Sequence, residues 1–83
     1  SNFSVAPFDV LIDNQHFPTV EHYYQCSKFH ADEIRSAIQK AVTPVEAKRL
    51  ADKYVAEMVP TWEKQRDSVM LRGLLEKFSQ HPR

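Results

Sequence analysis

The stretch VEHYYQCSKF, residues 20–29, is the most informative part of the sequence. It is also the first part of the chain with a clear helical pattern. It contains no glycine or proline, and a threonine that suits an N-cap stands immediately before it. On a helix, four of its polar side chains fall at positions i, i+3, i+4 and i+7 and share one face. These are Glu21, Tyr24, Gln25 and Lys28. The sequence therefore predicts a helix with a carboxylate, a phenol, an amide and an ammonium on one side.

This polar face has two interpretations that spacing alone leaves open. In the first, it is a solvated surface on which Glu21 and Gln25 make one weak contact. In the second, it is an active site in which Glu21 acts as a base or charge stabiliser while Gln25 and Lys28 orient a polar substrate. His22 and Cys26 also stand at i, i+4. Because no third group orients them, a small buried cysteine is a better interpretation than a nucleophile.

The adjacent Glu21 and His22 do not form a zinc-binding motif. The zincin motif His-Glu-x-x-His has the reverse order and requires a second histidine, whereas position 25 is Gln. The inverted motif His-x-x-Glu-His requires a histidine where Pro18 stands. A metal needs three or four converging ligands, so we expect neither a metal site nor a cofactor.

A short β-hairpin is expected before this helix. Phe8, Val10 and Ile12 recur at every second position, as on one face of a strand. An Asp-Asn pair at 13–14 supplies a turn that leads into a second short strand at 15–17.

Three further helices are expected after it. One covers about 32–41. The Thr-Pro pair at 43–44 is a strong start signal for another, whose apolar stripe extends to Met58. Thr61 is expected to cap a last helix that runs to about Ser79.

The last predicted helix contains Gly73, the only glycine of the chain. A glycine inside a helix costs about 1 kcal/mol relative to alanine, so we expect a neighbouring element to pack closely over it. Together these elements predict an α+β, mainly α fold. It consists of a short N-terminal β-hairpin followed by about four helices, in a single domain over residues 1–83.

Length, charge and composition exclude several classes of protein. The 83 residues suffice for one domain with one core. Eleven Lys and Arg residues balance eleven Asp and Glu residues, so the chain lacks the positive charge of a protein that coats nucleic acid. One glycine is too few for a Walker loop or a G-x-G-x-x-G motif, and one cysteine excludes an internal disulfide. Because no stretch is apolar enough to cross a membrane, we expect a cytoplasmic protein.

Several blocks of the sequence recur in the order in which they occur in one known family. They are Ser1-Asn2-Phe3-Ser4, Pro18 to Gln25 with Lys28-Phe29, Thr43-Pro44 with Glu46-Ala47-Lys48, Trp62, Val69-Met70, and Lys77-Phe78 with Gln80-His81-Pro82. Over its whole length the chain therefore resembles the NADAR superfamily, the YbiA-like proteins. The most specific part is the pattern Glu-His-x-x-Gln-x-x-Lys-Phe that begins at Glu21.

The resemblance implies an enzyme, an N-glycosidase that hydrolyses the bond between a base or amine and a phosphorylated ribose. The implied substrates are intermediates of riboflavin biosynthesis or ADP-ribose derivatives, including ADP-ribosyl-guanine and ADP-ribosylated nucleic acid. Glu21 is then the catalytic carboxylate. The implied substrate-binding residues are Asn2, Gln25, Lys28 and Trp62. For Trp62, a core anchor and a stacking platform both remain open.

Two features depart from the family pattern. Family members continue past the position of Arg83 into a segment with a further acidic residue and a glycine-rich motif that helps to close the pocket. We therefore expect an oligomer or a partner segment to complete the pocket of this chain. The loop at 54–61 also lacks basic residues that are common there in the family. The alternative function is a truncated or degenerate module that binds ADP-ribose-like ligands or a partner protein without turnover.

Overall fold

The computed structural model describes residues 9–82 and begins with a two-stranded antiparallel sheet. Strand β1 covers Val10–Ile12, and strand β2 covers Gln15–Phe17. Asp13 and Asn14 connect the strands with φ values of 53° and 63°, the left-handed conformation that a two-residue hairpin turn requires. Asp and Asn are the non-glycine residues that adopt this conformation most readily. The predicted hairpin and its turn are confirmed, while Phe8 of the predicted first strand lies outside the described residues.

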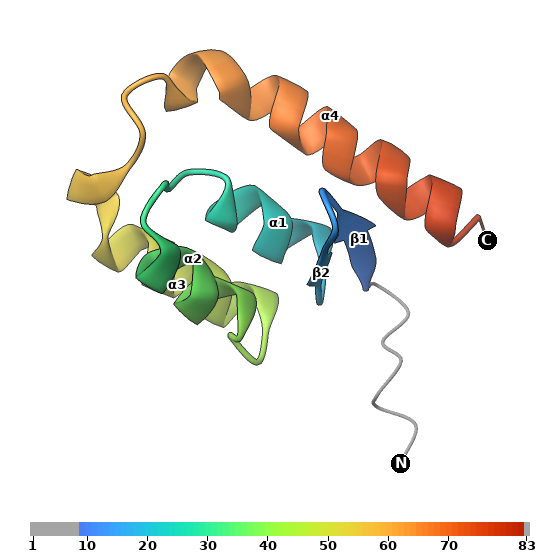
Figure 1. Cartoon of the computed structure of the whole chain (residues 1–83), viewed down its shortest axis with the longest axis horizontal. Helices are drawn as coiled ribbons and strands as arrows, with labels where there is room; N and C mark the ends of the chain where they lie inside the picture. The colour runs from blue at the N-terminus through green and yellow to red at the C-terminus, as the bar shows by residue number, and fades with distance from the viewer. Residues whose placement is uncertain (1–8, 83) are drawn as a thin grey trace.

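Four α-helices and one short 3-10 helix follow the hairpin. They are α1 (Val20–Cys26), α2 (Asp32–Gln39), α3 (Pro44–Lys53), the 3-10 helix η2 (Val55–Glu57) and α4 (Trp62–Gln80). Figure 1 shows α1 between α4 on one side and α2 and α3 on the other, with the hairpin near the N-terminal end of α1. The predicted α+β, mainly helical architecture is confirmed.

Two of the three expected threonine caps form. The hydroxyl oxygen of Thr19 accepts a hydrogen bond from the backbone N–H of His22 at 3.1 Å, and Thr43 does the same for Glu46 at 3.1 Å. The expected cap at Thr61 is wrong, because its side chain makes no capping bond. The backbone at Thr61 has φ −91° and ψ 9°, unlike the extended conformation of the other two caps.

Two helices are shorter than predicted. The first ends at Cys26, because Ser27 donates its hydroxyl to the carbonyl of Tyr23 and the N–H of Lys28 turns back to Gln25. Lys28 therefore follows the helix instead of continuing its polar face. The helix α3 ends five residues before Met58, since the chain tightens there into η2.

The hydrophobic core surrounds α1. Its buried side chains come from both strands, the first three helices and the connections between them: Val10, Ile12, Phe17, Val20, Tyr23, Cys26, Phe29, Ile38, Ala47 and Ala51. Partly buried side chains of α4, among them Val69 and Met70, pack against this cluster. Within residues 9–82, the buried polar side chains are His22 and Gln25, and both belong to α1. The helix that carries Glu21 thus also carries the polar groups of the interior.

Gly73 lies where α4 crosses α1. A Cβ atom at this position would lie 2.8 Å from Cγ1 of Val20 and 3.1 Å from Cδ2 of Tyr23. Both distances are shorter than ordinary van der Waals contact, so the glycine lets the two helices approach. The predicted close packing over Gly73 is confirmed.

Replacing Gly73 with Leu is expected to lower the free energy of unfolding by about 2 kcal/mol, because the added carbons must push α4 away from α1. Gly73→Ala is expected to cost less, since alanine gains about 1 kcal/mol of helix propensity that offsets part of the clash. Urea unfolding measures both. Ser68→Leu, at an exposed position of the same helix, is the control. Equal stability of Gly73→Leu and the control would contradict the packing role.

Candidate active site

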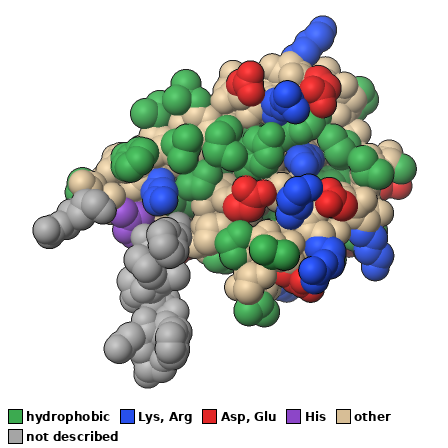
Figure 2. All heavy atoms as spheres, turned by 180° about the vertical axis from the view of Figure 1, so that it is seen from behind, with side chains coloured by type: hydrophobic (Ala, Val, Ile, Leu, Met, Phe, Trp, Pro, Cys, Tyr) green, Lys and Arg blue, Asp and Glu red, His purple; other side chains and the backbone are tan. Residues whose placement is uncertain are grey.

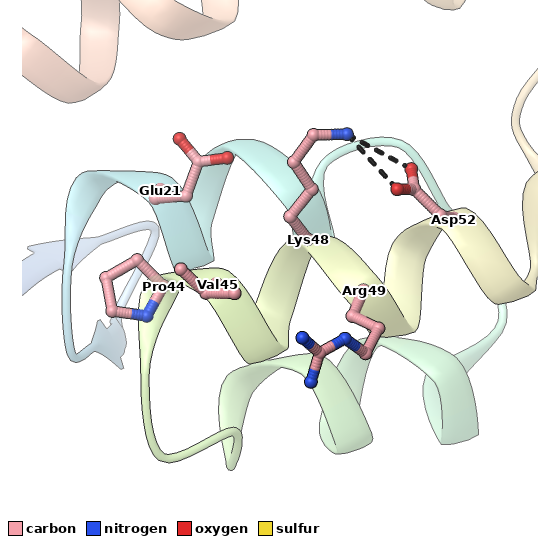
Figure 3. A pocket seen from close by; sticks show the side chains of 6 residues that line it. All are labelled: Glu21, Pro44, Val45, Lys48, Arg49 and Asp52. Carbon is pink, nitrogen blue, oxygen red and sulfur yellow. Dashed lines mark hydrogen bonds and ion pairs between the residues drawn. The ribbon is translucent and has the colours of Figure 1, made fainter.

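A cavity of about 430 Å³ lies between α1 and α3. Its lining residues are Glu21 from α1 and Pro44, Val45, Lys48, Arg49 and Asp52 from α3. Figure 3 shows the Glu21 carboxylate on α1 above Pro44 and Val45, with the Lys48 ammonium on the same side. A second, smaller hollow of about 270 Å³ shares Glu21 and Pro44 and reaches Lys77 of α4. The volume of the first cavity is in the range of small-molecule sites.

The Glu21 carboxylate is held from behind by Gln25. The Gln25 amide nitrogen donates to Oε2 of Glu21 at 2.6 Å, a short hydrogen bond to a charged acceptor. The Gln25 side chain is only 2% exposed, and its Oε1 atom has no partner within residues 9–82. Gln25 therefore does not line the cavity. The structure places it as a positioning residue for the carboxylate.

His22 fixes the helix α1 next to the start of α3. Its Nε2 lies 2.9 Å from the carbonyl oxygen of Ala41, and its Nδ1 lies 2.7 Å from Oγ1 of Thr19. A carbonyl only accepts, so Nε2 carries the proton and Nδ1 accepts from the Thr19 hydroxyl. Because Ala41 stands three residues before Pro44, the Nε2 bond ties α1 to the segment that leads into α3.

Lys28 lies over two aromatic rings after the end of α1. Its ammonium is 5.6 Å from the centre of the Tyr24 ring and 5.9 Å from that of Trp62, and the two rings meet edge to face at 5.1 Å. Burial lowers the pKa of Lys28, and the positive charge of Lys48 lowers it further, whereas Asp52 and Glu21 act in the opposite sense. Lys28 is not among the residues that line the two hollows with Glu21.

The charged residues of α3 were not predicted as site residues. Lys48 donates to both carboxylate oxygens of Asp52, at 3.2 and 3.3 Å, and Arg49 donates to Glu46 at 2.8 Å. The only signal in the sequence was that Lys48 belongs to one of the blocks shared with the family. Their place in the site depends on α3 packing against α1, which no local pattern reveals.

The predicted site residues are only partly brought together. Glu21 lines the cavity and Gln25 lies behind it, whereas Lys28 lies over the rings of Tyr24 and Trp62 and is not among the lining residues. Trp62 is 4% exposed and packs its ring against Tyr24, so it is placed as a core anchor and does not line the cavities that contain Glu21. Asn2 lies outside the described residues.

The alternative of a cysteine nucleophile has no support in the geometry. The Cys26 sulfur is buried and donates to the carbonyl of Arg35 at 3.3 Å, while both ring nitrogens of His22 are used elsewhere. Burial raises the pKa of Cys26 to about 11, which suppresses the thiolate that a nucleophile needs.

Cys26 is expected to react with a thiol reagent at pH 8 about 100-fold more slowly in the folded protein than in urea, because burial both raises its pKa and blocks access.

The unfolded thiol ionises near pH 9, and the folded thiol keeps its proton to about pH 11. Stability therefore falls as the pH rises through this window. Labelling and urea unfolding at pH 8 and 10 measure the two effects. If a Cys26→Ala variant lost as much stability as the wild type between pH 8 and 10, ionisation of the Cys26 thiol would not be the cause of the loss.

The described part of the chain holds neither a cluster of metal-ligand side chains nor a membrane-spanning helix. Among residues 9–82 there is no group of three or more His, Cys, Asp or Glu side chains placed to hold a metal ion. Across the same residues, no helix has the length and apolar character needed to cross a bilayer.

A family comparison gives the class of protein that this fold and cavity define. Residues 1–83 match the NADAR domain. The chain therefore belongs to the NADAR domain family, which confirms the resemblance seen in the sequence.

Named relatives share both sequence and fold. The chain is 33% identical over 81 residues to N-glycosidase YbiA of Escherichia coli (strain K12), a match that covers 98% of this chain and 49% of YbiA. It is 38% identical over 95 residues to riboflavin biosynthesis protein PYRR, chloroplastic, of Zea mays, covering 99% of this chain and 15% of that protein. The NMR structure of E. coli YbiA matches with a TM-score of 0.81 and 31% identity, over 93% of this chain and 46% of YbiA. The chain thus spans about half the length of the YbiA relatives.

Proposed function

We propose that this domain is an N-glycosidase that hydrolyses the C–N bond between a base or amine and a phosphorylated ribose, with Glu21 as the catalytic carboxylate. The observation that carries the proposal is the Glu21 carboxylate itself. It lines a cavity of about 430 Å³ and is fixed at 2.6 Å by a buried amide. The name N-glycosidase of the relative YbiA supports the reaction class.

The residues of the cavity suit this chemistry. Cleavage at the anomeric carbon passes through a transition state with oxocarbenium character. A carboxylate stabilises the positive charge that develops there, or takes a proton from the attacking water. Because Gln25 holds one oxygen of Glu21, the other oxygen is available to the substrate without a change of rotamer.

The basic side chains of α3 favour a phosphorylated sugar as substrate. Lys48 and Arg49 line the same cavity as Glu21 and place positive charge beside the carboxylate. An intermediate of riboflavin biosynthesis and an ADP-ribose derivative such as ADP-ribosyl-guanine both carry such phosphates. The name of the Zea mays relative supports the first of these substrates.

Product analysis tests the proposal. The purified chain is incubated with a phosphoribosylated aminopyrimidine and, separately, with ADP-ribosyl-guanosine. The expected result is free base or nucleoside and the corresponding phosphosugar, ribose 5-phosphate or ADP-ribose, in equal amounts. Binding of these compounds without any product would support the alternative, a module that recognises ADP-ribose-like ligands without turnover.

An exposed apolar face favours the proposal that more polypeptide completes the pocket. On α4, four large hydrophobic side chains are exposed: Leu71, Leu74, Leu75 and Phe78. Figure 2 shows hydrophobic side chains in a band beside acidic and basic ones on one face of the molecule. Because large exposed apolar patches mark interaction sites, a partner segment or a second copy of the chain is proposed to cover these side chains of α4.

A further inference from the structure

A polar hollow of about 320 Å³ lies between the hairpin, the end of α1 and α2. Its lining residues are Gln15 of β2, Cys26 of α1, and Asp32, Arg35, Ser36 and Gln39 of α2. It shares none of them with the two hollows that contain Glu21. Its volume is in the range of small-molecule sites, and the proposed hydrolysis uses none of its residues.

Arg35 uses only part of its guanidinium to hold the end of α1. Its Nη1 donates to the carbonyl oxygen of Cys26 at 2.8 Å and to that of Phe29 at 3.2 Å. These two bonds use both protons of Nη1, and the three N–H groups on Nε and Nη2 have no partner within residues 9–82. The edge formed by Nε and Nη2 can bind a carboxylate through two parallel hydrogen bonds. Because Nη1 already fixes the side chain, a ligand need not order it.

The positive charge of Arg35 also has no carboxylate beside it within residues 9–82. The other three arginines of this part of the chain each form an ion pair: Arg49 with Glu46, Arg66 with Glu63, and Arg72 with Asp13. Arg35 is partly buried, and its hydrogen bonds go to backbone carbonyls, which carry no full charge. A partly desolvated charge of this kind gains more from an anion than a fully hydrated one does.

Asp32 brings a separate negative charge to the same hollow. It stands one turn before Arg35 on α2, yet the two side chains form no ion pair, because the guanidinium binds the carbonyls at the end of α1. Residues three apart on a helix have Cβ atoms about 5–6 Å apart, so one small ligand can reach both charges. A simple anion would be repelled by Asp32, and a simple cation by Arg35. A zwitterion matches both.

We propose that this hollow binds a free α-amino acid with an uncharged polar side chain. Its carboxylate accepts from Nε and Nη2 of Arg35, and its ammonium donates to Asp32. This site is independent of the proposed N-glycosidase reaction, because it lies apart from Glu21.

The uncharged side chains of the hollow favour a carboxamide on the ligand. The Gln39 amide nitrogen donates to the carbonyl of His16, which leaves its oxygen as an acceptor. The amide of Gln15 and the hydroxyl of Ser36 have no partner within residues 9–82. Together they offer both donors and acceptors, which an apolar side chain would leave unpaired. L-Glutamine is therefore the probe.

Calorimetric titration of the full chain compares L-glutamine with three related compounds. L-Glutamine methyl ester lacks the carboxylate charge and is expected to bind about 10- to 100-fold more weakly, the usual effect of losing hydrogen bonds to a charged group. N-acetyl-L-glutamine lacks the ammonium and should lose about 2- to 5-fold, since Asp32 is exposed. L-Leucine has a similar size without the amide and should bind about 5-fold more weakly. Because all four are compared on the wild-type chain, the test does not depend on the folding of a variant.

Two variants of α2 assign the ammonium contact. Asp32→Asn is expected to weaken L-glutamine binding about 2- to 5-fold and to remove the difference between L-glutamine and its N-acetyl derivative. Glu33→Gln is the matched control, because Glu33 is the next residue, is also exposed and does not line the hollow. Its affinity for L-glutamine should equal that of the wild type.

Glu21→Gln separates this site from the candidate active site and should leave the affinity for L-glutamine unchanged. If Glu21→Gln weakened L-glutamine binding as much as Asp32→Asn does, the amino acid would occupy the other cavity and the inference would fail. No binding of L-glutamine by the wild type, or equal binding of L-glutamine and its methyl ester, would also overturn it. None of these outcomes depends on whether the chain releases a base from a ribosyl substrate.

Discussion

Replacing Glu21 with Gln is expected to reduce the rate of C–N bond hydrolysis about 10²- to 10⁴-fold, the usual contribution of a general base or acid. The substitution removes the negative charge but keeps the shape of the side chain. A Gln at this position still accepts the hydrogen bond that Gln25 donates, through its own amide oxygen. The fold and the substrate affinity should therefore change little, while the chemical step slows.

The control for this prediction is Glu63→Gln in the first turn of α4. Glu63 is exposed and lies outside the cavities that contain Glu21. Single-turnover measurements at saturating substrate isolate the chemical step from binding and product release. A Glu21→Gln variant with the turnover of the Glu63→Gln control would remove Glu21 from the mechanism.

Replacing His22 with Ala is expected to cost about 3 kcal/mol or more of folding free energy. The imidazole is fully buried, and its removal leaves a cavity together with an unpartnered carbonyl at Ala41. The Thr19 hydroxyl also loses the acceptor that orients it. For a chain of this size, such a loss lowers the midpoint of thermal unfolding by roughly 12 °C or more.

Thermal unfolding of His22→Ala beside His30→Ala measures this effect. His30 is exposed after the end of α1, so its replacement should change the midpoint very little. Since His22 ties α1 to the segment before α3, hydrolysis should also fall in the folded fraction of His22→Ala. Equal midpoints for the two variants would show that the His22 hydrogen bonds do not hold these helices together.

Local signals in the sequence were sufficient to predict most of the fold. Thr19 and the Thr-Pro pair at 43–44 mark helix starts through groups that lie within three residues, and the turn at 13–14 needs only residues that tolerate positive φ. The helix ends were harder to predict. Ser27 ends α1 by bonding to the backbone, although the predicted helical stretch continues to Phe29.

The site was only partly predictable, because its two walls come from different helices. Spacing on α1 placed Gln25 beside Glu21, as the structure confirms. Spacing did not reveal that Gln25 is buried, or that Lys48 and Asp52 line the same cavity as Glu21. Those facts depend on the packing of α3 against α1. The lack of a side chain at Gly73, by contrast, pointed directly to a close helix crossing.

Glu21 is proposed to cleave an N-glycosidic bond of a phosphorylated ribose. The release of free base by the wild-type chain and by Glu21→Gln, measured together with the affinity of each for the same phosphoribosyl substrate, tests this role. Similar binding by both proteins is expected, with product from the wild type alone on the same time scale. Equal product release by the two proteins, or binding by the wild type with no product, would contradict it.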